Sequence, residues 1–169
     1  MADEFDRIVR DYQDRIFRLA YSMLGNRAAA EETAQDVLVR VWKGLPGFRA
    51  ESSLSTWIYT ITRNSCLTAL RRRDLQPVSL EEAAPRHEME QRAAARWTVR
   101  ESPDAEEMLN RLPAKYRPVV VLFYMQEKSY DEVARMLQLP VGTVKTYLFR
   151  ARKSLAETLA RERVQKGGA

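Results

Sequence analysis

A helix face near the carboxyl end of the chain carries the residue types that bind DNA. Apolar residues recur there at steps of three and four, which predicts one buried stripe: Val144, Leu148, Ala151, Leu155 and Leu159. The opposite face holds cations, a hydroxyl and an aromatic ring: Lys145, Thr146, Phe149, Arg150 and Lys153. A major groove admits one helix, and its base edges and phosphates bind arginine, lysine and hydroxyl groups. The spacing indicates a nucleic-acid-binding helix, although a face that is only solvated would have the same composition.

The residues before this face predict the helix that would position it. Ser129 and Glu132 form a capping box, in which each side chain bonds the other residue's backbone amide. Residues 139–142 read Leu-Pro-Val-Gly, a tight turn, so we expect the second helix to begin near Thr143. A helix, a tight turn and a helix with a cationic outer face make a helix-turn-helix. The aromatic ring of Phe149, exposed among charges, suits thymine methyl groups, sugars or a protein partner.

The amino-acid composition excludes most kinds of enzyme active site. The 169 residues include one cysteine, Cys66, and one histidine, His87, so neither an internal disulfide nor a Cys/His zinc cluster can form. We therefore expect no catalytic residue, no metal and no cofactor. A nuclease built on carboxylates would have to use Glu31, Glu32 and Asp36, which share one solvent-facing helix with no partner cluster.

Charge and hydropathy suggest a cytoplasmic protein that contacts a polyanion. The acidic, amphipathic amino terminus is not a signal peptide, and the longest apolar run, residues 119–125, is too short to span a bilayer. The formal net charge is +5. Residues 44–73 hold five Lys and Arg against one Asp or Glu, and residues 140–169 hold seven against two. Two basic blocks separated by an acidic middle are typical of a polyanion bound at two places, although ordinary solvated helix faces give the same totals.

The apolar spacing predicts an all-α fold of two small helical domains joined by a flexible linker. In the first domain, residues 1–74, we expect a long helix that stops at Gly25, a second that Asn26 caps, and a third over residues 54–73. Residues 75–103 are proline-punctuated and charged, which predicts the linker, with transient helix near residues 88–97.

The second predicted domain, residues 104–169, has two helix starts before the capping box. Ser102-Pro103 is a cap followed by proline at the first helical position, and Pro113 provides another such start. Pro118 follows five residues later, so that helix either kinks or begins late.

Three segments together resemble the extracytoplasmic-function (ECF) sigma factors of bacteria. SYDEVARMLQLPVGTVKTYLFRARKSL resembles region 4 of that family, whereas AAAEETAQDVLVRVW and FRAESSLSTWIYTITRNSCLTALRRR resemble its region 2, in the right order. The resemblance implies a subunit that brings core RNA polymerase to promoters by recognising their −10 and −35 elements. It also implies regulation by an anti-sigma factor. A stand-alone helix-turn-helix regulator is the alternative, but it leaves residues 1–74 without a role.

The resemblance implies a role for each candidate residue. Region 2 would dock on the β′ clamp helices of the polymerase through the outward face of the second helix, and region 4 would contact the β flap. The docking residues are Gln35, Asp36, Val39 and Arg40. The −10 element would be captured by the loop of residues 48–53 and the third helix. The residues concerned are Phe48, Trp57, Arg63, Asn64, Arg71, Arg72 and Arg73.

Other interpretations of the region 2 residues remain open. Trp57 packs in the core or supports a base, and Asn64 recognises a base or simply lies on a helix surface. The three consecutive arginines contact phosphates or stabilise the carboxyl end of their helix.

The predicted −35 surface follows the outer face of the last helix. Its residues are Lys145, Thr146, Tyr147, Phe149, Arg150, Arg152 and Lys153. Tyr147 stands where the family often has arginine, and a tyrosine at the rim of this face cannot make a bidentate contact with guanine. The resemblance therefore does not assign a −35 sequence preference to this chain.

Overall fold

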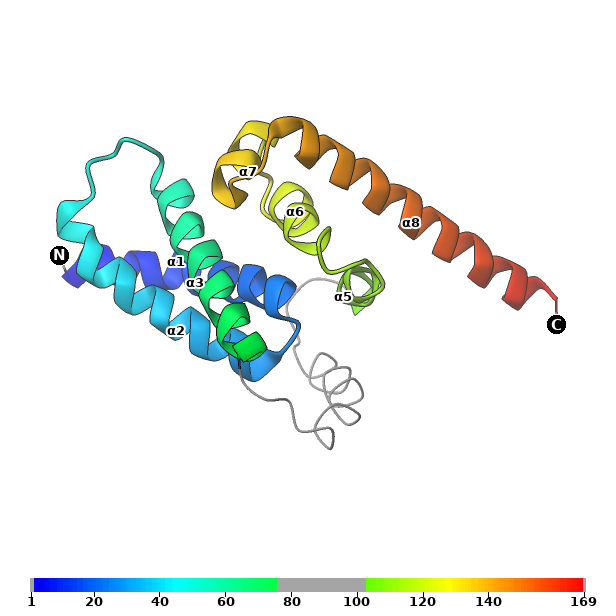
Figure 1. Ribbon diagram of the computed structural model, residues 1–169, viewed down its shortest axis with the longest axis horizontal. Coiled ribbons are helices and arrows are strands. Elements are labelled where there is room, and N and C mark those ends of the chain that lie inside the picture. The colour runs from blue at the N-terminus through cyan, green and yellow to red at the C-terminus, as the bar shows by residue number, and fades with distance from the viewer. Residues whose placement is uncertain (1, 76–102, 169) are drawn as a thin grey trace.

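The computed structural model describes residues 2–75 and 103–168, which are helical and contain no strand (Figure 1). The amino-terminal half holds α1 (Ala2–Leu24), α2 (Arg27–Gly44), the short 3-10 turn η1 (Leu45–Gly47) and α3 (Leu54–Leu75). The carboxyl-terminal half holds α5 (Pro103–Asn110), α6 (Arg117–Val120), the π-helical turn η2 (Val121–Met125), α7 (Tyr130–Leu137) and α8 (Val141–Gly167). The all-α prediction is confirmed for these ranges. The predicted linker, its transient helix and His87 lie outside the described residues.

Local signals at the ends of α1 and α2 behave as the sequence predicts. Gly25 has φ +66°, a left-handed conformation that glycine adopts without strain. Asn26 then caps α2, its side-chain oxygen accepting from the amide of Ala29 at 2.8 Å. The three helices enclose their own apolar core, which comprises Ile8, Ile16, Ala34, Val37, Val41, Leu45 and Ile58. These contacts hold α2 and α3 in place and so fix which residues of each helix face outward.

The helix-turn-helix is formed by α7 and α8. Both reciprocal bonds of the capping box between Ser129 and Glu132 are present. α8 begins at Val141, not near Thr143, because the carbonyl of Pro140 already accepts from the amides of residues 143 and 144, at 3.0 and 3.1 Å. Proline costs the helix nothing there, since its missing N–H lies outside the helical ladder. Pro118 occupies the first turn of α6 for the same reason, so the late start is the correct alternative and Pro113 lies in the preceding turn.

The two halves pack against each other, which no local sequence signal predicts. α7 lies beside α3 (Figure 1), and α6 and η2 contact α1. Leu19 of α1 and Tyr59 of α3 are fully buried in the same apolar cluster as Val119, Leu122 and Val133 of the other half. No helix in the described ranges has the length and apolar composition needed to cross a membrane.

Candidate nucleic-acid and protein interfaces

The inward side of α8 fixes which of its residues face outward. Val144, Leu148 and Ala151 are buried in the carboxyl-terminal core, as the spacing predicts. The stripe does not continue along the helix: Leu155 is half-buried and Leu159 is 40% exposed, so the prediction for Leu159 is wrong. The reason is the length of α8. α8 extends well past the body of the protein (Figure 1), so little protein covers its distal turns.

Most of the predicted −35 residues form an exposed surface on α8. Those exposed are Lys145, Thr146, Phe149, Arg150, Arg152 and Lys153. Phe149 is 65% exposed, an unusual position for a large apolar ring without a binding partner. The hydroxyl of Thr146 donates to the carbonyl of Gly142 at 2.9 Å, so its side chain is held against the helix.

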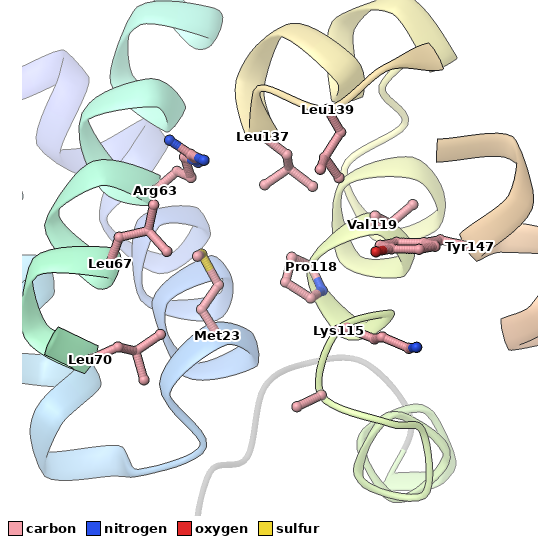
Figure 2. Close-up of a pocket in the computed structure, with 11 residues that line it drawn as sticks. Met23, Arg63, Leu67, Leu70, Lys115, Pro118, Val119, Leu137, Leu139 and Tyr147 are labelled. Atoms are coloured by element: carbon pink, nitrogen blue, oxygen red, sulfur yellow. The ribbon is translucent and has the colours of Figure 1, made fainter. Parts of the chain in front are cut away.

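Tyr147 differs from the other members of the predicted set. It is half-buried, and its ring packs edge-on against Tyr116 with 5.2 Å between centroids. In the close-up it lies among the residues of α6 and α7, on the side that faces the amino-terminal half (Figure 2). Tyr147 therefore lies half-buried at the edge of the exposed face, with the ring of Tyr116 as its packing partner.

Two tyrosines that the sequence analysis did not select border the exposed face. Tyr130 stacks parallel on Phe123, with 4.8 Å between centroids, and the Lys145 ammonium lies 5.6 Å from the Tyr130 ring. Tyr124 is 51% exposed, and its hydroxyl accepts from Arg152 Nε at 2.5 Å. The only available signal was that a tyrosine directly after a helix cap lies in the first, usually exposed turn. These rings contact Lys145 and Arg152, which the sequence analysis treated as independent side chains.

The predicted −10 residues are divided between the surface and the core. Trp57 is half-buried, and its ring packs on Phe48 with 4.9 Å between centroids. Asn64 is exposed, and its side-chain oxygen accepts from Arg63 Nη1 at 3.0 Å. The same Arg63 nitrogen donates to the side-chain oxygen of Gln138, in the other half of the chain, at 2.9 Å.

The three consecutive arginines have different surroundings. Arg71 and Arg72 are exposed at the end of α3. Arg73 is half-buried, and its guanidinium donates to the carbonyl of Leu24 at 3.0 Å. Arg73 therefore satisfies the last carbonyl of α1 and ties two helices together, which leaves the first two arginines as the better candidates for phosphate contact.

The outward face of α2 is a second exposed surface. Gln35, Asp36, Val39 and Arg40 are all exposed, with Val39 at 50%. Trp42, which the sequence analysis did not select, continues this surface: it is 40% exposed and its ring packs edge-on against Phe5 at 4.9 Å. Apolar side chains exposed beside charges are typical of a protein-binding surface.

The nuclease alternative gains no support from the geometry. Arg27 Nε donates to Glu31 at 2.9 Å, an ordinary surface ion pair. Among the described side chains, no three His, Cys, Asp or Glu residues come together in a way that could hold a metal ion. Cys66 is fully buried, and burial raises the pKa of its thiol to about 12, so little nucleophilic thiolate forms at neutral pH.

Comparison with known proteins identifies the family that each half of the chain resembles. Residues 8–76 match sigma-70 region 2, and residues 104–155 match sigma-70 region 4. The chain is 34% identical over 167 residues to the ECF RNA polymerase sigma factor SigW of Bacillus subtilis (strain 168), covering 93% of this chain and 89% of SigW. It is 28% identical over 166 residues to the RNA polymerase sigma-H factor of Pseudomonas aeruginosa, covering 92% and 86%.

A solved structure shows the same fold. The sigma factor RpoE from Bartonella quintana, in complex with the anti-sigma factor NepR, has a TM-score of 0.69 against this chain. The sequence identity is 24%, and the match covers 93% of this chain and 97% of that one.

Proposed function

This chain belongs to the extracytoplasmic-function sigma factors and is an alternative sigma factor, which binds core RNA polymerase and directs promoter-specific transcription; on that premise, we propose how its exposed surfaces divide the work. Residues 1–74 dock on the polymerase and read the −10 element, residues 75–103 connect the halves, and residues 104–169 read the −35 element. The observation that carries this division is the pair of separate exposed surfaces, one on α2 and one on α8, in a single chain.

The face of α2 is the polymerase-docking surface. Asp36 and Arg40 supply charges that complement a partner and steer association, and Val39 supplies apolar area between them. Trp42 lies at the end of the same exposed surface and extends it. The face points away from the apolar core of the three helices, so a partner can bind it without unfolding them.

Promoter DNA meets the chain at two places. On α3, Asn64 recognises a −10 base, and Arg71 and Arg72 contact phosphates. Trp57 of α3 and Phe48 of the loop before it support that base. On α8, Arg150 reads a −35 base edge and Lys153 contacts phosphate. Base contacts supply specificity, whereas phosphate contacts fix the register of the protein on the duplex.

A regulatory partner and a location complete the proposal. RpoE of Bartonella quintana, which shares this fold, was solved with the anti-sigma factor NepR. We place this chain in the cytoplasm, under an anti-sigma factor of its own. Sigma factors are transcription initiation factors rather than catalysts, and we assign no catalytic residue, cofactor or metal to this chain.

Run-off transcription with purified core polymerase tests the proposal. Core enzyme and the wild-type chain are incubated with a library of genomic promoter fragments, and transcript starts are mapped. We expect discrete starts that core enzyme alone does not produce, with shared sequences near −10 and −35. A chain that binds DNA but adds no starts would be a stand-alone regulator.

A further inference from the structure

The exposed face of α8 consists of two lines of side chains, because positions i, i+4 and i+7 lie above one another on a helix. The first line is Lys145, Phe149 and Arg152, and the second is Thr146, Arg150 and Lys153. Both cations of the first line contact tyrosines of other elements. Within residues 2–75 and 103–168, neither cation of the second line has a hydrogen-bond or ion-pair partner. The two lines therefore differ in how firmly their cations are held.

Three aromatic rings form a continuous row beside the first line. Phe123 lies in the middle: it stacks on Tyr130 with 4.8 Å between centroids and packs edge-on against Tyr124 at 5.0 Å. Phe123 is half-buried and packs on the same apolar core as Val144 and Leu148 of α8. Tyr124 and Tyr130, at the two ends of the row, are exposed. The shared core thus fixes the two exposed tyrosines relative to α8.

The π-helical turn η2 supplies two of these rings. In this turn the amide of Gln126 donates to the carbonyl of Val121, five positions back, at 3.1 Å. Such a wide turn is uncommon and occurs mostly at functional sites. It carries Phe123 and Tyr124 as consecutive residues, of which the first packs on the core and the second is 51% exposed. The buried ring therefore supports the exposed one where it meets α8.

Tyr124 holds the guanidinium of Arg152. Arg152 Nε donates to the Tyr124 hydroxyl at 2.5 Å, and the guanidinium carbon lies 5.7 Å from the centre of the same ring. An arginine has five N–H donors in a rigid planar fork, so a bond at Nε fixes the orientation of the whole group. That bond does not use the two terminal nitrogens, which together can bind a phosphate bidentately.

The position of Arg152 on α8 suits the DNA backbone. With about 3.6 residues per turn, the line that contains Arg150 lies opposite the buried stripe, and the line that contains Arg152 lies about a quarter turn to one side. When a helix enters a major groove, the side opposite its buried stripe faces the base edges, and its flanks face the phosphates that border the groove. Arg152 is therefore held at a flank, where phosphate is the available acceptor.

We propose that Tyr124 is a positioning residue for promoter recognition, which holds Arg152 ready to bind one phosphate of the −35 duplex. This contact sets the register of α8 in the groove, from which Arg150 reads the bases. The inference rests on the proposed role of α8 in −35 recognition. Because Tyr124 orders the arginine before DNA arrives, less conformational entropy is lost on binding.

The arrangement predicts different effects for the two partners. Tyr124→Phe removes the hydroxyl but keeps the ring and the charge of Arg152, so the phosphate contact still forms, from a more mobile side chain. We expect affinity to fall by about 3- to 10-fold for all sequences alike, with the salt slope unchanged. Arg152→Ala removes the contact itself and should lower the salt slope by about one charge.

Reconstituted holoenzyme tests the inference. Core polymerase is combined with each variant chain, and the dissociation constant for a duplex that carries the −35 element of a mapped promoter is measured at several salt concentrations. Tyr12→Phe is the matched control. The Tyr12 hydroxyl is hydrogen-bonded to that of Ser55 at 3.1 Å, so this variant also loses a tyrosine hydrogen bond, but in the amino-terminal half. It should bind the duplex as wild type does.

Combined and conservative variants separate positioning from a purely structural role. In a chain that already carries Arg152→Ala, Tyr124→Phe should cause no further loss of affinity, because no guanidinium is left to hold. Arg152→Lys leaves Tyr124 unaltered and keeps the positive charge, but an ammonium cannot form the bidentate contact. It should retain the wild-type salt slope and lose about as much affinity as Tyr124→Phe.

Equal affinity of the Tyr124→Phe and wild-type holoenzymes would overturn the inference. The same is true if Tyr124→Phe weakens binding equally with and without Arg152→Ala, because the hydroxyl would then act independently of the arginine. Failure of the wild-type holoenzyme to prefer any promoter fragment over a random duplex would instead overturn the proposed function.

Discussion

Gly44 lies so close to the indole of Trp57 that a Cβ at this position would come within 2.9 Å of Cζ2 and 3.3 Å of Cη2. Any larger residue at the end of α2 would therefore have to displace a side chain of α3. The same indole packs on Phe48 in the loop assigned to the −10 element. The absence of a Cβ at Gly44 thus leaves room for the indole that packs against this loop.

Replacing Gly44 with alanine should destabilise the amino-terminal half. Alanine gains up to about 1 kcal/mol of helix propensity over glycine, but overpacking against an indole that is already in contact with Phe48 costs about 1–3 kcal/mol. We expect a net loss in the free energy of unfolding, measured by denaturant titration. Gly47→Ala is the control, because no atom lies within 4 Å of a Cβ there. Equal stability of the two variants would show that Trp57 moves aside freely.

Asp36→Arg should weaken binding to core polymerase. Asp36 is exposed, so the fold should be unaffected. If its carboxylate becomes desolvated against a cation of the partner, the loss should be about 2–5 kcal/mol, and less at the rim of the interface. Titration of core enzyme with labelled chain measures it, with Glu157→Arg on the exposed part of α8 as the charge-matched control. Unchanged affinity of the Asp36 variant would place the docking surface elsewhere.

Arg150→Ala and Lys153→Ala should affect −35 binding differently. Both side chains are exposed on α8. A bidentate arginine–guanine pair contributes about 1–3 kcal/mol of discrimination, so Arg150→Ala should flatten the preference at one or two −35 positions. Lys153→Ala should weaken all sequences alike and lower the salt slope by about one charge. Binding to single-base promoter variants at several salt concentrations measures both effects. A uniform loss with Arg150→Ala would exclude it from base readout.

The capping box should make α7 sensitive to acid. The amide of Ser129 donates to the Glu132 carboxylate and lowers the pKa of that carboxyl. A carboxyl with a lower pKa in the folded state contributes stability above its unfolded pKa and loses it as the pH falls through the folded pKa. Glutamine can replace glutamate in a capping box. The stability advantage of wild type over Glu132→Gln should therefore shrink on acidification, as thermal unfolding across a pH series would show. A constant difference would contradict this.

Gln138→Gly should relieve backbone strain but remove a contact between the two halves. Gln138 has φ +53°, a conformation that costs a residue with a side chain about 1–2 kcal/mol relative to glycine. Glycine removes that strain but cannot bond Arg63. Ala50→Gly, at φ +55° in the other half, is the control, because it relieves similar strain without removing a polar side chain. We expect Gln138→Gly to raise the free energy of unfolding by less than Ala50→Gly does, as denaturant titration would show. Equal gains would show that the Arg63 contact is unimportant.

The sequence predicts best those features that depend only on residues close together in the chain. The stop at Gly25, the cap at Asn26 and the box between Ser129 and Glu132 each involve residues at most three positions apart, so the pattern alone is sufficient. The buried face of α8 follows in the same way from its spacing, up to the point where the helix extends past its neighbours.

Contacts between distant residues were not predictable in this way. Tyr59 and Gln126 are 67 positions apart, and no local pattern connects them. The orientation of Tyr147 depends on the ring of Tyr116, and Arg63 meets Gln138 only because α7 packs beside α3. The candidate residues could therefore be selected from the sequence, but their partners could not.

Gln138 also has an evolutionary consequence. Its left-handed backbone favours glycine, so natural drift at this position should run toward glycine or asparagine unless another requirement retains a long amide. The bond to Arg63 supplies such a requirement. Among descendants of a common ancestor, substitutions at 63 and 138 should therefore occur together. Lineages that lost this bond should have glycine at 138 and be free to vary at 63.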